Sequence, residues 1–238
     1  MTRQNRKAAA TRFRQNIRRS NELHAEYLDD ERLLKNYDGF TNWQLEYLLP
    51  RFSDLHAKEG YAEAIDFTVS DLAGISISSR DHDLERAAPA ITNLLPLRAL
   101  QTIATAAEMN ARILEANIRI CRQLQVGNDL PDPISETEYC IACREASSID
   151  ECMEIIHLVS GLGGTLKTLV KVPMIGITLR AMRVPAYAAG FGALQEFLES
   201  GYLTFRQIPD IEHFLVEIEQ RATEVFERIY RTPIEQLH

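Results

Sequence analysis

Apolar residues recur along this chain at intervals of three and four positions, which is the spacing of one face of an α-helix. The clearest case is residues 97–126, a segment long enough for a central helix of about 45 Å. Its expected buried face consists of Leu100, Ile103, Ala104, Ala107, Ala111, Leu114, Ile118, Cys121 and Leu124. The pattern predicts an all-α fold, a single-domain bundle of about eight or nine helices with a long central helix.

Several helix starts are predicted from local capping signals. Two S-x-x-E sequences, at residues 135–138 and 148–151, are capping boxes and should each begin a helix. Pro209-Asp210 is expected to begin a final helix that ends near residue 231. Residues 66–81 are the least helical part of the chain, and we expect an ordered loop there, with Ser79 or Asp81 capping the following helix.

Helix ends are predicted from glycine and proline. We expect a first helix over residues 8–36 that is followed by a break at Gly39, and Thr41 with Gln44 should cap the next helix. The other expected breaks are Pro50, Pro173, Pro185 and Gly201, with a loosened segment at Gly161, Gly163 and Gly164.

Charge is unevenly distributed. The formal net charge is −8, yet residues 1–19 contain seven basic side chains and no acidic one. We therefore divide the chain into a basic N-terminal arm or helix extension over residues 1–20 and a helical domain over residues 21–238. Three interpretations stay open: an arm that contacts nucleic acid, anionic lipid or an acidic partner, a segment that resembles an organellar transit peptide, or a solvated helix beside the chain's own acidic surface. No nucleic-acid-binding motif supports a nucleic-acid partner.

No transmembrane segment is predicted, since charges and prolines divide the longest apolar region. No signal peptide is predicted either, since the N-terminus lacks an apolar region. The four cysteines are then expected to be reduced thiols in the cytoplasm. Cys140 and Cys143 form a C-x-x-C pair, but a structural zinc site needs a second close pair that the sequence lacks. We interpret them as buried, unligated core residues.

The most informative segment runs from residue 157 to residue 195, where no acidic residue occurs. Its charged side chains are Lys167, Lys171, Arg180 and Arg183. Isolated cations among small and apolar residues usually have an anionic partner. The sequence therefore predicts a soluble helical binding protein, with these four residues binding an anionic or amphipathic small ligand or an acidic protein surface. Glycines before Lys167 add exposed N–H groups to this expectation, although the spacing is wrong for a phosphate-binding P-loop.

Two other functions stay open, and the sequence names no cofactor. Glu154 and His157 form an E-x-x-H pair, which on a helix places both side chains on one face, as in a heme-oxygenase-like metal-dependent oxidase. No second E-x-x-H sequence is present. The third possibility is a structural homodimer formed through an apolar helix face. Whether the protein is an enzyme is not determined.

Two segments resemble an uncharacterised proteobacterial all-helical family, a domain of unknown function. The first is Ser79-Arg80-Asp81, leading to Pro89 and Leu95-Pro96. The second is the run Met182-Arg183-Val184-Pro185-Ala186, followed by Ala189-Gly190, Leu194-Gln195, Phe197-Leu198-Glu199 and Gly201. The resemblance covers most of residues 45–230 and excludes the basic arm. It implies a bacterial cytosolic helical protein and carries no known activity, substrate or catalytic residue.

Overall fold

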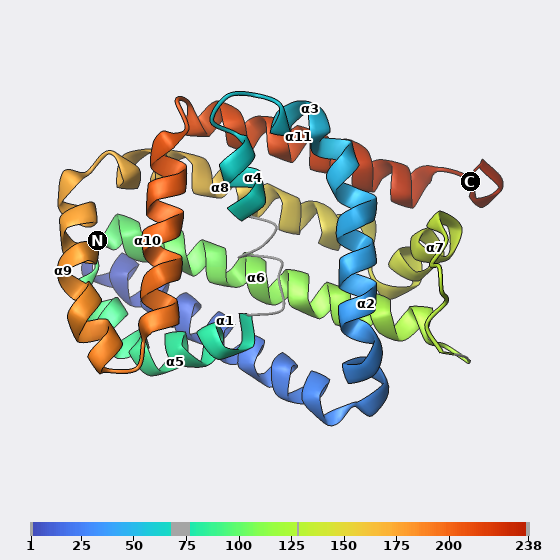
Figure 1. Ribbon diagram of the computed structural model, residues 1–238, viewed down its shortest axis with the longest axis horizontal. Coiled ribbons are helices and arrows are strands. Elements are labelled where there is room, and N and C mark those ends of the chain that lie inside the picture. The colour runs from blue at the N-terminus through green and yellow to red at the C-terminus, as the bar shows by residue number, and fades with distance from the viewer. Residues whose placement is uncertain (1, 68–76, 128, 237–238) are drawn as a thin grey trace.

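The computed structural model of the chain describes residues 2–67, 77–127 and 129–236, and its secondary structure is helical throughout (Figure 1). Nine of the described helices have eleven residues or more, which confirms the all-α bundle. In chain order the elements are α1 (Thr2–Asp29), α2 (Glu31–Leu48), η1 (Leu49–Phe52), α3 (Ser53–His56), α4 (Ala62–Phe67), α5 (Ile77–Leu94), α6 (Leu97–Leu124), α7 (Glu136–Ala146), α8 (Ile149–Val170), α9 (Pro173–Ala188), α10 (Gly192–Gln207), α11 (Ile211–Arg231) and η3 (Ile234–Gln236).

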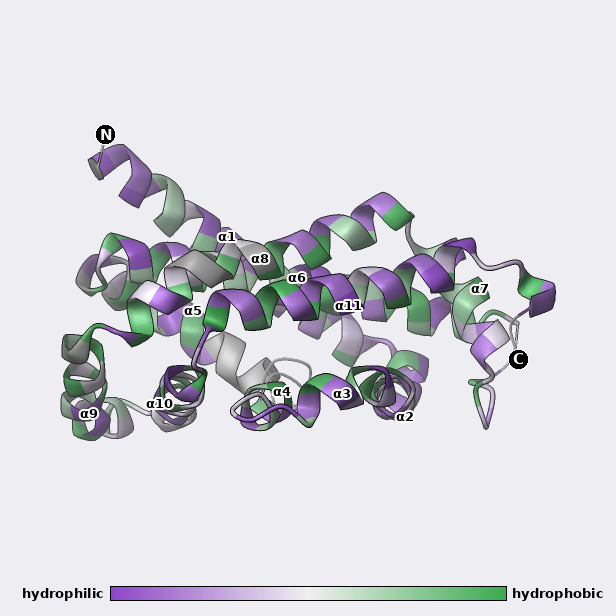
Figure 2. Ribbon diagram, turned by 90° about the horizontal axis from the view of Figure 1, so that it is seen from above, coloured by the Kyte–Doolittle hydropathy of each residue, from purple (hydrophilic) through white to green (hydrophobic). Residues whose placement is uncertain are grey.

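The helices form two layers, which are clearest in Figure 2. One layer contains α1, α5, α6, α8 and α11, and the other contains α2, α3, α4, α9 and α10. Helix α6 is the centre of the first layer and packs against α1, α7 and α8. Its predicted face is buried, and a second side of the helix, which contains Met109 and Ile120, is buried as well. Burial on two sides is what a central helix requires, so the prediction for residues 97–126 is confirmed to within two residues.

The predicted capping boxes are present. Ser135 accepts a hydrogen bond from the Glu138 N–H while Glu138 Oε2 accepts one from the Ser135 N–H, and Ser148 and Glu151 do the same at the start of α8. The Asp210 side chain caps α11 as expected. These motifs were predictable because each is complete within four consecutive residues.

The first two predicted helix boundaries were wrong. The chain turns at Asp30, whose side chain accepts a hydrogen bond from the Leu33 N–H, and α2 then runs unbroken through Gly39. Thr41 is buried inside α2, where its hydroxyl donates to the Tyr37 carbonyl, so it is not a cap. Helix α5 starts at Ile77, before the predicted Ser79 or Asp81. Most of the predicted 66–81 loop lies outside the described residues.

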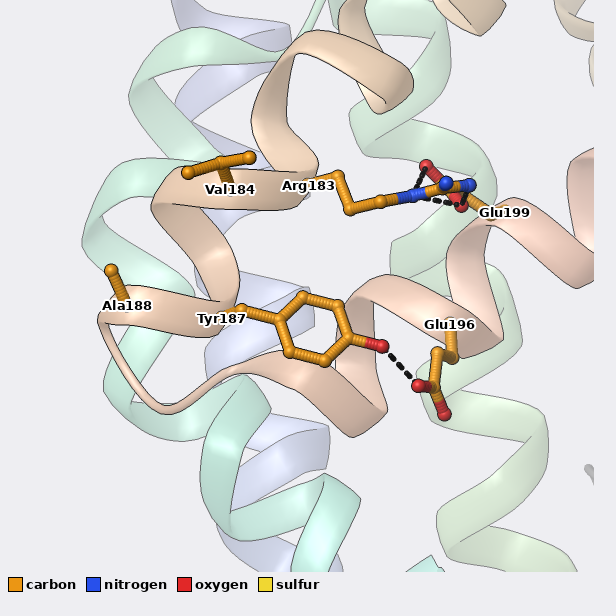
Figure 3. Close-up of a pocket in the computed structure, with 6 residues that line it drawn as sticks. All are labelled: Arg183, Val184, Tyr187, Ala188, Glu196 and Glu199. Atoms are coloured by element: carbon orange, nitrogen blue, oxygen red, sulfur yellow. Dashed lines mark hydrogen bonds and ion pairs between the residues drawn. The ribbon is translucent and has the colours of Figure 1, made fainter.

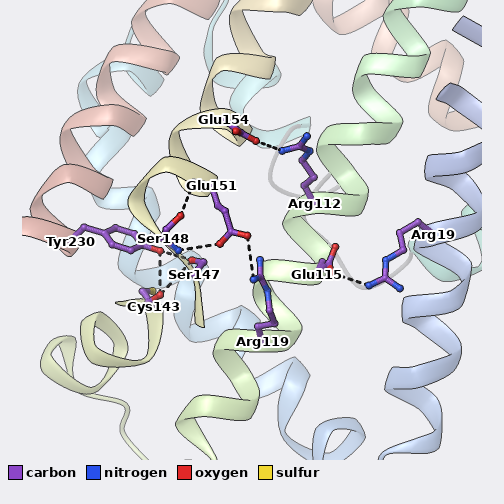
Figure 4. Close-up of polar contacts among 10 residues, drawn as sticks. All are labelled: Arg19, Arg112, Glu115, Arg119, Cys143, Ser147, Ser148, Glu151, Glu154 and Tyr230. Carbon is purple, nitrogen blue, oxygen red and sulfur yellow. Dashed lines mark hydrogen bonds and ion pairs between the residues drawn. The ribbon is translucent and has the colours of Figure 1, made fainter. Parts of the chain in front are cut away.

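The basic N-terminal residues belong to α1, which packs along α5 and α6. Arg6 donates to the Thr92 and Leu95 carbonyl oxygens at 2.8 and 2.7 Å, where the end of α5 leaves carbonyls without helical partners. Arg19 pairs with Glu115 at 2.8 Å (Figure 4). Phe13 and Ile17 are buried in the core, so they are not available to insert into lipid. Much of the basic sequence therefore contacts the chain's own groups.

Three of the four helix interruptions predicted between residue 161 and residue 201 were also wrong. Helix α8 runs straight through Gly161, Gly163 and Gly164, Pro185 lies inside α9, and Gly201 lies inside α10. The actual break falls at Gly190, whose φ of 81° is accessible to glycine at little cost. Pro173, by contrast, begins α9 as predicted.

Alanine substitution at two of these helix-interior glycines should change the free energy of unfolding in opposite directions. A Cβ at Gly201 would lie 2.9 Å from Cζ of Phe67, a ring held between Phe197 and Phe205, whereas a Cβ at Gly161 would meet nothing within 4 Å. We expect Gly161→Ala to raise the free energy of unfolding by about 0.5–1 kcal/mol through helix propensity. Gly201→Ala should lower it by about 1–3 kcal/mol through overpacking. Urea unfolding of both variants measures the two signs, and equal signs would contradict the packing of α10 against α4.

Among the described residues, no helix is both long and apolar enough to cross a lipid bilayer.

Candidate functional site

The candidate site is a pocket where the C-terminal end of α8, the N-terminal half of α9, the C-terminal half of α10 and the start of α11 meet. Its volume is about 640 Å³, and we call it the cation pocket. It is lined by Lys167, Val170, Lys171, Gly176, Ile177, Arg180, Tyr202, Arg206, Ile208, Pro209, Asp210 and Ile211. Three of the four cations that the sequence singled out therefore line one pocket.

A glycine allows two of the helices that form the pocket, α9 and α10, to approach each other closely. A Cβ at Gly176 would lie 2.9 Å from Cε1 of Tyr202, so only a residue without a side chain lets α9 approach α10 this closely. Tyr202 is buried, and Val170, Ile208 and Ile211 extend the same apolar cluster below the pocket. The base of the pocket, which we call the apolar floor, is thus formed by apolar side chains, and the cations lie around it.

Three of the four cations in the pocket have no direct partner, although the charge of Arg180 also acts on Glu199 and helps to lower the pKa of that carboxylate. Lys171, Arg180 and Arg206 make no hydrogen bond or ion pair within the described ranges 2–67, 77–127 and 129–236. Lys167 donates to Glu212, and this hydrogen bond raises the pKa of its ammonium. Asp210 is the acidic residue of the lining, and its Oδ1 accepts from the His213 N–H. The pocket therefore retains a net positive charge.

Arg183 lies apart from the other three predicted residues. It forms an ion pair with Glu199 in a second hollow of about 630 Å³ between α9 and α10, where Tyr187 donates to Glu196 (Figure 3). The pairing with Arg183 lowers the pKa of Glu199, and Gln195 also donates to this carboxylate at 2.9 Å. Arg180 and Arg183, three residues apart on α9, thus line different hollows, and Arg183 already has an anionic partner.

Arg206 and Tyr202 are the lining residues that sequence reasoning missed. Both follow Glu199, outside the acid-free segment, and they join the pocket because α10 folds back along α9. No local signal in the sequence marks this return.

The glycines before Lys167 do not supply a backbone anion site. They lie inside α8, where the amide groups belong to the helical hydrogen-bond ladder. The expectation of exposed N–H groups at a glycine-rich helix start was therefore wrong, and the positive charge of the site comes from side chains.

Glu154 and His157, the metal-ligand candidates, face basic and acidic neighbours on α6 and α11. Glu154 Oε2 accepts from Arg112 at 2.7 Å (Figure 4). His157 Nε2 lies 3.7 Å from Glu219 Oε1. In the part of the chain that the structure describes, no group of three or more His, Cys, Asp or Glu side chains is placed to hold a metal ion. The second carboxylate pair that a di-iron site needs is not assembled by these residues.

The four cysteines are free thiols in apolar surroundings. Burial raises the pKa of Cys140 to about 11 and those of Cys121 and Cys152 to about 12, and it raises the pKa of Cys143 as well. A thiol needs to ionise before it binds zinc or attacks a disulfide, so these groups are suited to packing rather than chemistry.

The raised pKa values predict slow thiol labelling. At about pH 8 the native protein should react with iodoacetamide at least about 100-fold more slowly than the protein in denaturant, because the thiolate fraction is much smaller. Because the folded pKa values are raised, these thiols also favour the native state less as the pH rises above the ordinary thiol pKa. One rapidly alkylated cysteine in the native protein, identified by mass spectrometry, would contradict the burial described here.

Comparison with known proteins gives one match. A family model described as "Domain of unknown function (DUF8198)" matches residues 23–235. No curated protein and no solved structure matches the chain. The matched range contains all the residues of the cation pocket and leaves out the most basic part of α1.

Proposed function

The chain belongs to the DUF8198 family of unknown function, and we propose, from its own residues, that it binds an anionic small molecule in the cation pocket. The observation that carries the proposal is that Lys171, Arg180 and Arg206 line one pocket beside Lys167 and make no hydrogen bond or ion pair among the described residues. The chain as a whole has a net charge of −8. Like charges held together raise the free energy of the folded protein, and a bound anion removes that cost.

The chemistry of the lining favours phosphate or carboxylate groups. Arg180 and Arg206 each offer a planar guanidinium that can donate two parallel hydrogen bonds to such a group, and Lys171 adds a point charge. The apolar floor gives room for an apolar portion of the ligand. A volume of about 640 Å³ accommodates a small metabolite.

A calorimetric titration of the protein with pyrophosphate tests the proposal. We expect saturable binding at one site that weakens steeply as sodium chloride is raised from about 0.05 M to about 0.5 M, because salt screens the cations. Citrate serves as the carboxylate probe. The absence of saturable binding by both probes at low salt would contradict the proposal.

Other sequence-based expectations stay predictions. These are the bacterial origin implied by the resemblance, a cytoplasmic location, and homodimer formation through an apolar helix face. Light scattering over a concentration series measures the last, and a strict monomer would contradict it.

A further inference from the structure

One face of α9 is apolar and exposed, and it borders both hollows, because Ile177 lines the cation pocket while Val184 and Ala188 line the hollow beside Glu199. Its residues are spaced by three and four positions, which places them in one stripe. Met174 is 68% exposed, Ile177 62% and Val184 77%. We call this stripe the outer α9 face; it consists of Met174, Ile177, Ala181, Val184 and Ala188. Single exposed apolar side chains are ordinary, but a stripe along a whole helix indicates a contact with something else.

The N-terminal half of this face lies among positive charges, whereas Val184 and Ala188 border Arg183, Glu196 and Glu199. Helix α9 contains Arg180 and Arg183 and no acidic residue, and Lys171 precedes it. Arg183 is neutralised by Glu199, and Glu196 is the other carboxylate nearby. The unpaired charges therefore gather around the N-terminal half of α9 and the C-terminal end of α10.

A second basic region lies at the same end of the molecule. Figures 1 and 2 place α9 and the N-terminal end of α1 at one end of the long axis. Arg3 and Lys7, in the first two turns of α1, are exposed and have no hydrogen bond or ion pair among the residues described. This end of an otherwise acidic protein thus presents unpaired cations from α1, α9 and α10.

We propose that this end of the protein docks on an anionic phospholipid bilayer, with the outer α9 face entering the interface. Amphipathic helices bind such surfaces by burying apolar side chains at the acyl boundary while basic side chains contact the headgroups. A second copy of the chain is a poor occupant, because the contact would bring unpaired cations together. Cations spread over three helices match an extended anionic surface better than one acidic partner helix. The inference does not depend on ligand binding in the cation pocket.

Co-sedimentation with large unilamellar vesicles tests this inference. Phosphatidylcholine vesicles with about 30% phosphatidylglycerol should bind the protein at least about tenfold more strongly than phosphatidylcholine alone. The decisive variant is Val184→Asp, and its matched control is Val126→Asp. Val126 is 71% exposed, and it follows α6 at the opposite end of the molecule. Both changes add one negative charge at a valine of similar exposure.

We expect Val184→Asp to lower the partition coefficient by about tenfold, since burial of one valine is lost, and Val126→Asp to leave it nearly unchanged. Met174→Asp, on the same stripe, should repeat the loss if Val184→Asp folds poorly. Three results would overturn the inference: no sedimentation of the unchanged protein, equal binding by the two aspartate variants, or a vesicle-free dimer that Val184→Asp dissociates. Pyrophosphate titration of Val184→Asp reports on the cation pocket separately.

Discussion

Replacing Lys171 and Arg206 together by serine should weaken pyrophosphate binding by about 100-fold. Each side chain is expected to donate at least one charge-assisted hydrogen bond to the anion, and each such bond contributes about 1.5 kcal/mol or more. Both side chains line the same pocket, Lys171 from the turn after α8 and Arg206 from α10. Their joint loss therefore removes two of the three unpaired charges while Arg180 remains. Calorimetry at constant ionic strength measures the change.

The same variant should keep its stability. Because neither Lys171 nor Arg206 has a partner in the described part of the chain, their removal breaks no ion pair. The free energy of unfolding should stay within about 0.5 kcal/mol of the unchanged protein. A large loss of stability would show that these cations hold the helices together and are not a binding site.

A control variant removes the same charge elsewhere. Arg14→Ser with Lys35→Ser also lowers the net charge by two. Arg14 is an exposed residue of α1, and Lys35, on α2, lies 3.4 Å from Asp129 in a pair between exposed side chains. It should bind pyrophosphate almost as well as the unchanged protein. Equal weakening by the two double variants would assign the binding to overall charge, contrary to the proposed site.

Tyr139→Ala should destabilise the protein by about 3–5 kcal/mol, because a fully buried aromatic ring leaves a cavity that its neighbours fill only in part. Tyr139 is 0% exposed and packs against Trp43 and Tyr47, with ring centroids 5.1 and 5.2 Å away. Its hydroxyl accepts from the Gln44 side chain at 3.0 Å. The ring therefore fixes α2 against α7, and urea unfolding measures its contribution.

Two further variants serve as controls. One removes only the hydroxyl of Tyr139, and the other removes a tyrosine that is exposed. Tyr139→Phe keeps the ring, and Gln44 still has the Asn117 side chain at 3.2 Å, so the loss should be about 1 kcal/mol. Tyr187→Ala removes a tyrosine that is 51% exposed and should cost less than about 1 kcal/mol. Similar losses for Tyr139→Ala and Tyr187→Ala would contradict the core described here.

The parts of the fold that were predictable from sequence are those specified within a few residues. The capping boxes at the starts of α7 and α8 each need only two side chains and the intervening backbone. The stripe on α6 was predictable because its face is buried along the full length of the helix. Asp30 was missed, although its side chain caps α2 in the same local way.

Helix ends predicted from glycine and proline were wrong at positions where the helix continues in spite of the low helix propensity of these residues. Gly201 weakens α10 as an isolated helix, but it admits Phe67 from α4 at a distance that no Cβ allows. Pro185 lies inside α9 and does not end it. Such positions are interpreted as helix ends when only the neighbouring residues in the sequence are considered.

The candidate site was predictable in part for the same reason. The absence of acidic residues marked Lys167, Lys171 and Arg180, and the structure places these three around one pocket. Arg183 belonged to the same sequence signal, yet Glu199 reaches it from α10. Arg206 carried no signal at all. Both outcomes depend on how α10 returns along α9, which residue spacing does not specify.

The most direct test of the cation pocket is a ¹H–¹⁵N NMR titration that follows the arginine Nε–Hε groups as pyrophosphate is added. We predict that the resonances of Arg180 and Arg206, assigned by single substitutions, shift and saturate together. Arg144, which donates to the Ile229 and Thr232 carbonyls at the far end of α11, should not move. Unchanged Arg180 and Arg206 resonances at saturating pyrophosphate would contradict the account.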